Sequence, residues 1–228
     1  MKKNYTISFL LMMGIINNFF AQQQIEISLS GPIANATTAN KNPTPLANDT
    51  LKPPGLSKPC GKTYYTYHLN PPNSGYAFGN NSLGEKESAQ KYNYTGAISE
   101  ILVWYFGKKG TTGSSTAKIY SINASTKAPE TVLSESAAIT TGDITKNPAV
   151  YTFSPPVSVS GGFAASVVFP TNGDTVGLNC TTAGCCSSDS LSWVNVFGGW
   201  WSVNKLFKIN LDLIILPVAS INTVGVNE

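Results

Sequence analysis

Residues 208–216, KINLDLIIL, are the stretch of sequence that most clearly decides the fold. Apolar side chains recur there at every second position, and polar ones stand between them at Asn210 and Asp212. Successive side chains of a strand point to opposite faces, so this pattern predicts a strand with one face in a core and one in water. The polar face ends at Ile214 and Leu216, which predicts burial on both faces at that end.

Short runs of the same period-two kind recur from Cys60 onward, separated by clusters of Gly, Pro and Asn. They predict strands at residues 63–69, 98–106, 117–122, 150–153, 163–169, 175–178, 191–197, 200–207 and 208–216. No stretch keeps an apolar period of 3.6 residues for three turns, which disfavours parallel βαβ architecture and Rossmann-type cofactor binding. The predicted fold class is therefore all-β, an antiparallel two-sheet β-sandwich that is jelly-roll-like.

Composition divides the chain into four parts. Residues 1–21 are predicted to be a signal peptide, because two lysines precede an apolar run and a small-residue cleavage site. Residues 22–59 contain six prolines and no aromatic residue, which predicts an extended leader. Residues 60–220 hold the aromatic side chains needed for a core and are the predicted β-sandwich domain. Residues 221–228 are a predicted C-terminal tail or linker.

The charge of the chain excludes some classes of partner. Its 15 basic residues are all lysines and stand against 12 acidic ones; removing Lys2 and Lys3 with the signal peptide leaves 13 against 12, or +1. No basic cluster is longer than Lys108-Lys109, so no nucleic-acid partner is expected. Residues 211–218 are apolar but far shorter than the ~20 residues of a membrane-spanning helix. The mature chain is predicted to lack a transmembrane segment and to be secreted, extracellular or at the cell surface.

Several of these runs carry a likeness to a known group. They are residues 98–109, 117–124, 151–153, 156–163, 172–178, 199–203 and 213–218. Together, over roughly residues 92–220, they resemble extracellular β-sandwich domains of secreted Bacteroidota proteins that are clients of type IX secretion. The resemblance implies export and surface attachment through a separate C-terminal sorting domain. Residues 224–228 resemble the linker before such a domain, which this sequence lacks, so either the sequence is truncated or the protein is exported by another route.

Four cysteines, Cys60, Cys180, Cys185 and Cys186, are candidates for disulfides. An even number in an exported chain predicts two bridges. Because adjacent cysteines bridge each other poorly, Cys60 is expected to pair with Cys180 or with one member of the Cys185-Cys186 pair. The alternatives are one bridge with two free thiols, and a four-thiolate zinc site, which the unpaired spacing and oxidising compartment disfavour.

The sequence offers little for catalysis. A Ser-His-Asp hydrolase would have to use His68, the one histidine, and the Gly-x-Ser-x-Gly elbow is absent. Paired carboxylates could hydrolyse glycosides, and Glu100 and Asp212 lie inside strand patterns, where the solvent face is their expected place. Other acids, such as Glu85 and Glu87, are expected in turns or at the surface. No enzyme activity is predicted.

Loop oxygens around Asp143 and residues 172–174 are an alternative site for calcium, a cation that needs clustered carboxylates and carbonyls. No EF-hand spacing is present. The prediction is no cofactor and no metal, with a loop calcium kept open.

Aromatic residues give the leading functional prediction. Trp193, Trp200 and Trp201 crowd a hairpin whose turn holds Gly198-Gly199. Neighbouring strand residues face opposite sides, so Trp200 and Trp201 cannot both fill one core, and an exposed ring can stack on a sugar. The prediction is a secreted, non-catalytic binding module for carbohydrate or for cell-surface or extracellular material. Its partner would be a polysaccharide or surface glycan. One alternative is a structural or adhesive domain that contacts an extracellular protein and buries these rings; a second is a glycan-active hydrolase.

Overall fold

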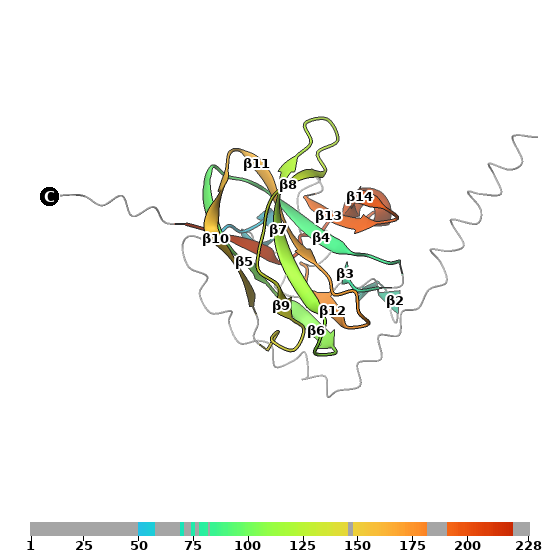
Figure 1. The fold of residues 1–228 in the computed structure, drawn as a ribbon. Coiled ribbons are helices and arrows are strands. Elements are labelled where there is room, and N and C mark those ends of the chain that lie inside the picture. Colours follow the sequence, from blue (N-terminus) through green and yellow to red (C-terminus); the bar gives the residue numbers. More distant parts are fainter. Residues whose placement is uncertain are drawn as a thin grey trace, which may run out of the picture.

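The computed structural model describes residues 50–57, 69–70, 74–75, 78–81, 83–145, 148–181 and 191–220, and most of their regular structure is β (Figure 1). The strands are β1 (Leu69–Asn70), β2 (Ser74–Gly75), β3 (Phe78–Gly79), β4 (Glu87–Asn93), β5 (Gly96–Val103), β6 (Tyr105–Lys109), β7 (Ser114–Ile122), β8 (Pro129–Glu135), β9 (Ile139–Thr140), β10 (Ala149–Val159), β11 (Gly162–Val168), β12 (Thr175–Leu178), β13 (Ser192–Val196), β14 (Gly199–Ser202) and β15 (Ile215–Ala219). The two short helices are α2 (Pro54–Ser57) and α3 (Val203–Phe207). Among the described residues, no helix has the length and apolar character needed to cross a bilayer.

The strands form two packed layers. The larger sheet has the order β14-β13-β4-β11-β7-β8, with β9 paired to β7. The second layer consists of two three-stranded sheets, β10-β5-β15 and β3-β12-β6. The chain passes from the first of them to the second at Trp104, the single residue between β5 and β6. All the recorded strand pairs are antiparallel, and most connections pass from one sheet to another. The structure confirms the predicted all-β antiparallel sandwich.

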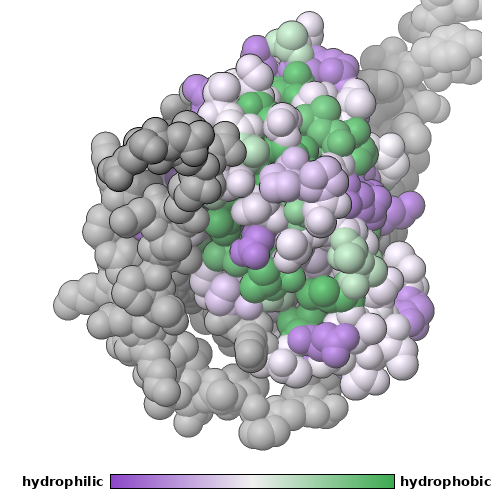
Figure 2. Space-filling model, turned by 60° about the vertical axis from the view of Figure 1, so that its left-hand side comes forward, coloured by the Kyte–Doolittle hydropathy of each residue, from purple (hydrophilic) through white to green (hydrophobic). Residues whose placement is uncertain are grey.

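One continuous core lies between these layers. Every sheet but the β1–β2 pair contributes to it, and its largest side chains are Tyr151, Phe78, Phe163 and Phe169. Tyr92 of β4 stacks on Phe163 of β11 with ring centroids 5.7 Å apart. On the face shown in Figure 2, apolar residues lie in patches that polar residues interrupt.

Strand β10 forms an edge of its three-stranded sheet. Its register with β5 shifts between Thr152 and Val157, and the exposed Pro155 and Pro156 lie within this irregular stretch. Proline has no N–H to donate to a ladder, so an edge strand is where a sheet tolerates it.

The central strands β4 and β11 of the larger sheet are buried on both of their faces. The inner face of the sheet, toward the main core, includes Phe163, Ala165 and Val167 of β11, as the sequence pattern predicted. The residues between them, Ala164 and Ser166, are also fully buried, on the opposite face. We call this second side the outer face; large aromatic side chains pack on it, as the next section describes.

The sequence prediction was wrong at residues 200–207. Strand β14 ends at Ser202, and α3 follows at once. The Ser202 side chain accepts a hydrogen bond from the backbone N–H of Lys205 at 3.1 Å, and Lys208 closes the helix with a left-handed φ of 59°. A serine that caps the first turn is a normal start for a helix, and here it overrides the strand pattern.

The prediction for residues 208–216 was wrong in its boundaries and its polar face. Only residues from Ile215 onward belong to a strand, β15, while Leu213 forms an isolated bridge with Cys180. Asp212 is 0% exposed rather than in water. Burial of Ile214 and Leu216 is confirmed.

Some strands were not predicted, and one prediction is untested. Strands β4 and β8 were missed because their sequences are largely polar, and β2, β3 and β9 were missed because each has only two residues. The expectation that Glu85 and Glu87 lie in turns or at the surface was wrong, since both are buried. Most of the predicted strand 63–69, with His68, lies outside the described residues.

Candidate functional site

The β13–β14 hairpin is built on a two-residue turn, Phe197-Gly198, between the paired residues Val196 and Gly199. Both turn residues have positive φ, 55° and 81°, which is the pattern of a type I′ turn. Gly198 adopts this region without steric cost. Phe197 adopts it at a steric cost, because a bulky residue at positive φ is a backbone outlier. Phe197 is also 59% exposed.

The register of this hairpin separates the predicted tryptophans. Trp200 lies opposite Asn195, and both side chains are on the outer face. Trp193 is two residues before Asn195 on β13, so its side chain is on the same face. Trp201 lies opposite Val194 on the other side, but β14 is the last strand of its sheet, so the Trp201 ring is 46% exposed. Trp193 is only 6% exposed. The exposed rings of the hairpin are therefore Trp201 and Phe197.

Trp200 and Trp193 cover the outer face. They pack with Tyr120, Ala89 and Ala164 in a second apolar cluster, separate from the main core. Trp200 meets the Tyr120 ring edge-on, with centroids 5.6 Å apart and planes at 80°. Small residues in the floor let these large rings lie close to the sheet. The sequence analysis named Trp193, Trp200 and Trp201 as ligand-binding residues. In the structure Trp193 is buried, Trp200 is half-buried in this cluster and Trp201 is exposed, and ligand binding by any of them stays a prediction.

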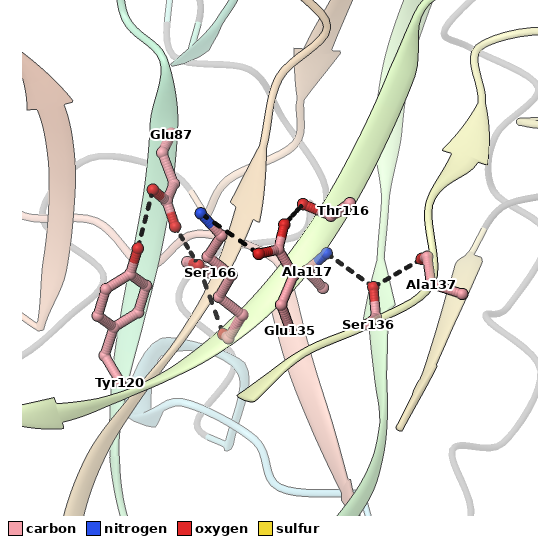
Figure 3. Close-up of polar contacts among 9 residues, drawn as sticks. Glu87, Thr116, Ala117, Tyr120, Glu135, Ser136, Ala137 and Ser166 are labelled. Carbon is pink, nitrogen blue, oxygen red and sulfur yellow. Dashed lines mark hydrogen bonds and ion pairs between the residues drawn. The ribbon is translucent and has the colours of Figure 1, made fainter. Parts of the chain in front are cut away.

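Glu87 lies on the same face, two residues before Ala89 on β4, and Figure 3 shows its carboxylate between Tyr120 and Ser166. Its carboxylate accepts a hydrogen bond from Tyr120 Oη at 3.1 Å and another from Ser166 Oγ at 2.5 Å. Burial raises the pKa of Glu87, opposed by the Ser166 hydrogen bond, the charge of Lys118 and the Tyr120 hydrogen bond. Burial and the neighbouring Glu87 also raise the pKa of Tyr120. The Glu87 network therefore ties together three strands of the sheet.

The carboxylates proposed for hydrolysis lie in different surroundings. Asp212 Oδ1 accepts a hydrogen bond from Gln90 Nε2 at 2.9 Å in the interior, and the Asp212 backbone is bonded to Thr181. Glu100 lies on β5, opposite Thr152 and Val218 of its neighbours. Asp212 is fully buried, whereas Glu100 is half-buried on β5.

The loops suggested for calcium use their carboxylates internally. Asp174 Oδ2 accepts backbone N–H bonds from Thr112 at 2.8 Å and Gly113 at 2.5 Å. Asp143 Oδ2 accepts a hydrogen bond from the side-chain hydroxyl Oγ1 of Thr140 at 2.6 Å. Within the described ranges, no group of three His, Cys, Asp or Glu side chains could hold a metal ion. Asp174 therefore joins its loop to the loop between β6 and β7, and Asp143 closes its own turn.

The cysteine prediction stays open. Cys180 is buried beside Leu213, at the bridge between the two segments. Cys60, Cys185 and Cys186 lie outside the described residues.

Phe197 is the residue that sequence reasoning missed. It stood at the end of the predicted strand 191–197, next to the predicted Gly198-Gly199 turn, and was left out of the binding prediction. A signal was available, because two-residue turns of this kind usually hold Asn or Asp before Gly, and here a large aromatic residue takes that position.

Comparison with known proteins adds little to this site. No family model matches the chain, and no curated protein is similar to it. A structure of the cysteine protease and lectin-like domains of Cwp84, a surface layer associated protein of Clostridium difficile, aligns with a TM-score of 0.44 and 10% identity, covering 60% of this chain and 32% of that one. A propeptide-cleaved form of the protease gives the same values and 36% coverage. The alignment thus spans about a third of those chains, and similarity this weak carries no functional argument.

Proposed function

We propose that the protein is an exported, non-catalytic module that binds carbohydrate, with Trp201 and Phe197 as the rings that contact the ligand. One observation carries the proposal. The hairpin exposes two large aromatic side chains, and one of them is held in a backbone conformation that disfavours it. Strain that a fold retains at an exposed aromatic residue supports a binding role for that residue.

The chemistry of the hairpin suits a sugar. The apolar faces of pyranose rings stack on exposed aromatic side chains, and hydroxyl groups need donors and acceptors nearby. Lys205 is exposed on α3, which follows β14 directly, and its ammonium group carries three N–H donors. Export is supported by the signal-like sequence of residues 1–21.

The test is a titration of the mature chain with neutral polysaccharides, followed by tryptophan fluorescence. Trp201→Ala and Phe197→Ala should each weaken binding about tenfold or more, since truncating an aromatic anchor commonly costs over 1 kcal/mol. Val150→Ala is the matched control, because Val150 is an exposed apolar residue on a different sheet. Unchanged affinity in both aromatic variants, or no binding to any glycan, would refute the proposal.

A second candidate function is protein contact through β8. This strand forms the other end of the larger sheet and exposes Val132 and Leu133, at 45% and 46%. Exposed apolar residues on an edge strand are a common docking surface for another chain. Self-association or partner binding that is lost in Val132→Asp, with no glycan affinity, would favour this alternative.

A further inference from the structure

Strand β8 is an open edge of the larger sheet. It pairs with β7 on one side, and among the described strands none pairs with it on the other. Residues 130–133 are exposed one after another, so both faces of the strand meet solvent as well as its edge. Two of these residues are apolar, Val132 at 45% and Leu133 at 46% exposed. An edge of this kind pairs readily with another chain unless charge or proline blocks it.

The backbone of Val132 is directed toward this open edge. Thr131 donates its N–H to Ser121 Oγ of β7 at 3.1 Å. Backbone groups alternate in direction along an antiparallel strand, so the N–H and C=O of the next residue, Val132, point away from β7. The register between β7 and β8 shifts on each side of the Tyr120–Val132 pair. These shifts confine regular pairing with a new strand to the middle of β8.

Two other edge strands are less suited to pairing. Strand β10 has Pro155 and Pro156 in its irregular stretch, and β14 has four residues and ends where α3 begins. In β8 proline occurs only at the first residue, Pro129. Its middle residues, Thr131 to Leu133, favour a strand, and the acids Glu130 and Glu135 stand on either side of them.

The charges of β8 favour one register for pairing with a second copy of itself. Val132 is the middle residue of Pro129–Glu135, so two antiparallel strands centred on it overlap over their whole length. Glu130 of one copy then faces Ser134 of the other, and Glu135 faces Pro129. A slip by one residue toward the C-terminus instead brings Glu130 opposite Glu135 twice, and like charges directly opposite destabilise a sheet. The strand is therefore complementary to itself at full overlap.

We propose that the protein forms a two-fold dimer through β8, with a second copy of this chain as the partner. The contact uses the same strand from both copies, so it closes on itself and adds no further copies. The two-fold axis passes between the two Val132 residues, and the larger sheet of one copy continues into that of the other. Since regular pairing is limited to the middle of one strand, we expect a weak dimer with a Kd of about 10 µM or higher.

The dimer would carry two copies of the ring site, one at each far end of the joined sheet. Strands β8 and β14 are the two ends of the strand order β14-β13-β4-β11-β7-β8. About 11 spacings of ~4.8 Å therefore separate the two β14 strands, or roughly 50 Å along the sheet. A two-fold axis perpendicular to the sheet places both hairpins on the same side.

This arrangement would strengthen binding to long chains. A long polysaccharide can reach both hairpins, so its second binding event becomes intramolecular and its overall affinity rises. A trisaccharide is too short to bridge the two sites. This consequence rests on the proposed carbohydrate function, whereas the dimer itself does not.

Sedimentation velocity of the mature chain over about 1 µM to 1 mM measures the dimer directly. Val132→Asp is the disrupting variant, because it places two like charges opposite each other at the axis. Ser160→Asp is the matched control, since it adds the same charge at an exposed position between β10 and β11. Val132→Thr keeps a β-branched side chain and should retain the dimer. Unfolding midpoints show that each variant remains folded.

Cysteine variants test the register. In the dimer the two Cβ atoms at position 132 lie about 4.5–5.5 Å apart, so mild oxidation of Val132→Cys should link the copies by a disulfide. Thr131→Cys is the control, because residue 131 faces Leu133 of the other copy and the two new thiols are too far apart to bridge. Wild type oxidised in the same way gives the background level of linking.

We expect wild type, Val132→Thr and Ser160→Asp to dimerise over the same concentration range, and Val132→Asp to stay monomeric. Wild type should bind a long polysaccharide at least about tenfold more tightly than a trisaccharide of the same sugar. Val132→Asp should lose this gain and keep the trisaccharide affinity.

Three results would overturn the proposal: a wild-type monomer at every concentration, a dimer that survives Val132→Asp, or equal linking of the two cysteine variants. A dimer that gains no affinity for the long chain would overturn the bridging of two sites. A dimer that binds no glycan at all would refute the proposed function and leave the β8 contact intact.

Discussion

The left-handed turn at Phe197 allows stability and binding to be separated by two substitutions. Phe197→Asn and Phe197→Ala both remove the exposed ring, so they lose the same aromatic contacts. They differ in backbone preference, because asparagine enters the left-handed region readily and alanine does not. A non-glycine residue there costs about 1–2 kcal/mol, and asparagine escapes part of this cost. The asparagine variant should therefore be more stable than the alanine variant by about 1 kcal/mol.

The assay is urea unfolding followed by fluorescence, with the slope m required to be equal in the two variants. Lys208 supplies a matched control, since it has a φ of 59° and is exposed at the end of α3. Lys208→Asn should likewise exceed Lys208→Ala by about 1 kcal/mol, and neither should change glycan binding. Both Phe197 variants should bind glycan equally weakly.

Two results would refute this reasoning. Equal stability of Phe197→Asn and Phe197→Ala would mean that the turn is not left-handed at this residue in solution. Wild-type affinity in either variant would mean that the ring has no part in binding.

Three further predictions concern the framework. Burial raises the pKa of Glu87 above its ordinary 4.5. The protonated carboxyl therefore stabilises the fold fully below pH 4.5, and this contribution is lost as the pH rises through the folded-state pKa. Glu87→Gln should flatten the dependence of the unfolding free energy on pH, and an unchanged profile would contradict this. Trp200→Ala should cost about 2–4 kcal/mol in chemical unfolding because it uncovers the outer face, whereas a cost below about 1 kcal/mol would show that the ring is no cover. Gly79→Ala would place a Cβ 2.1 Å from Val176 O and should prevent folding or lower the unfolding free energy by over about 3 kcal/mol. Gly84 is also at positive φ but has open space around it, so Gly84→Ala should cost only about 1 kcal/mol by calorimetry. Equal costs for the two variants would contradict the steric argument.

The alternation of apolar and polar residues predicted correctly which side chains of a strand face the main core. Alternation located Phe163, Ala165 and Val167 in the core, and it separated Trp200 from Trp201 before the register was known. It could not show that Ala164 is buried too. The side chains that cover Ala164 on the outer face come from other strands, β7, β13 and β14. Period-two patterns report the polarity of one strand and not what lies across it.

Buried polar residues account for most of the remaining errors. Asp212 alternates with apolar residues as a solvent-facing acid would, yet its carboxylate meets Gln90, which is 122 positions away in sequence. Glu87 likewise depends on Ser166 and Tyr120 for its partners. Such partners are brought together by the tertiary fold, so local composition favours the wrong environment for each acid.

The candidate site was predicted in its location and only partly in its residues. The hairpin was identified from its tryptophans, but the exposed neighbour Phe197 was overlooked because turn residues were assigned on composition.

The prolines of β10 have a consequence for how copies of this protein behave when crowded. A free strand edge is a template on which a foreign strand can add, and repeated addition produces fibrils. Pro155 and Pro156 leave the edge strand β10 without two successive backbone N–H donors. Another strand therefore cannot pair with β10 at these residues. The chain can thus keep a long, exposed border strand at high local concentration without that border nucleating amyloid-like polymerisation.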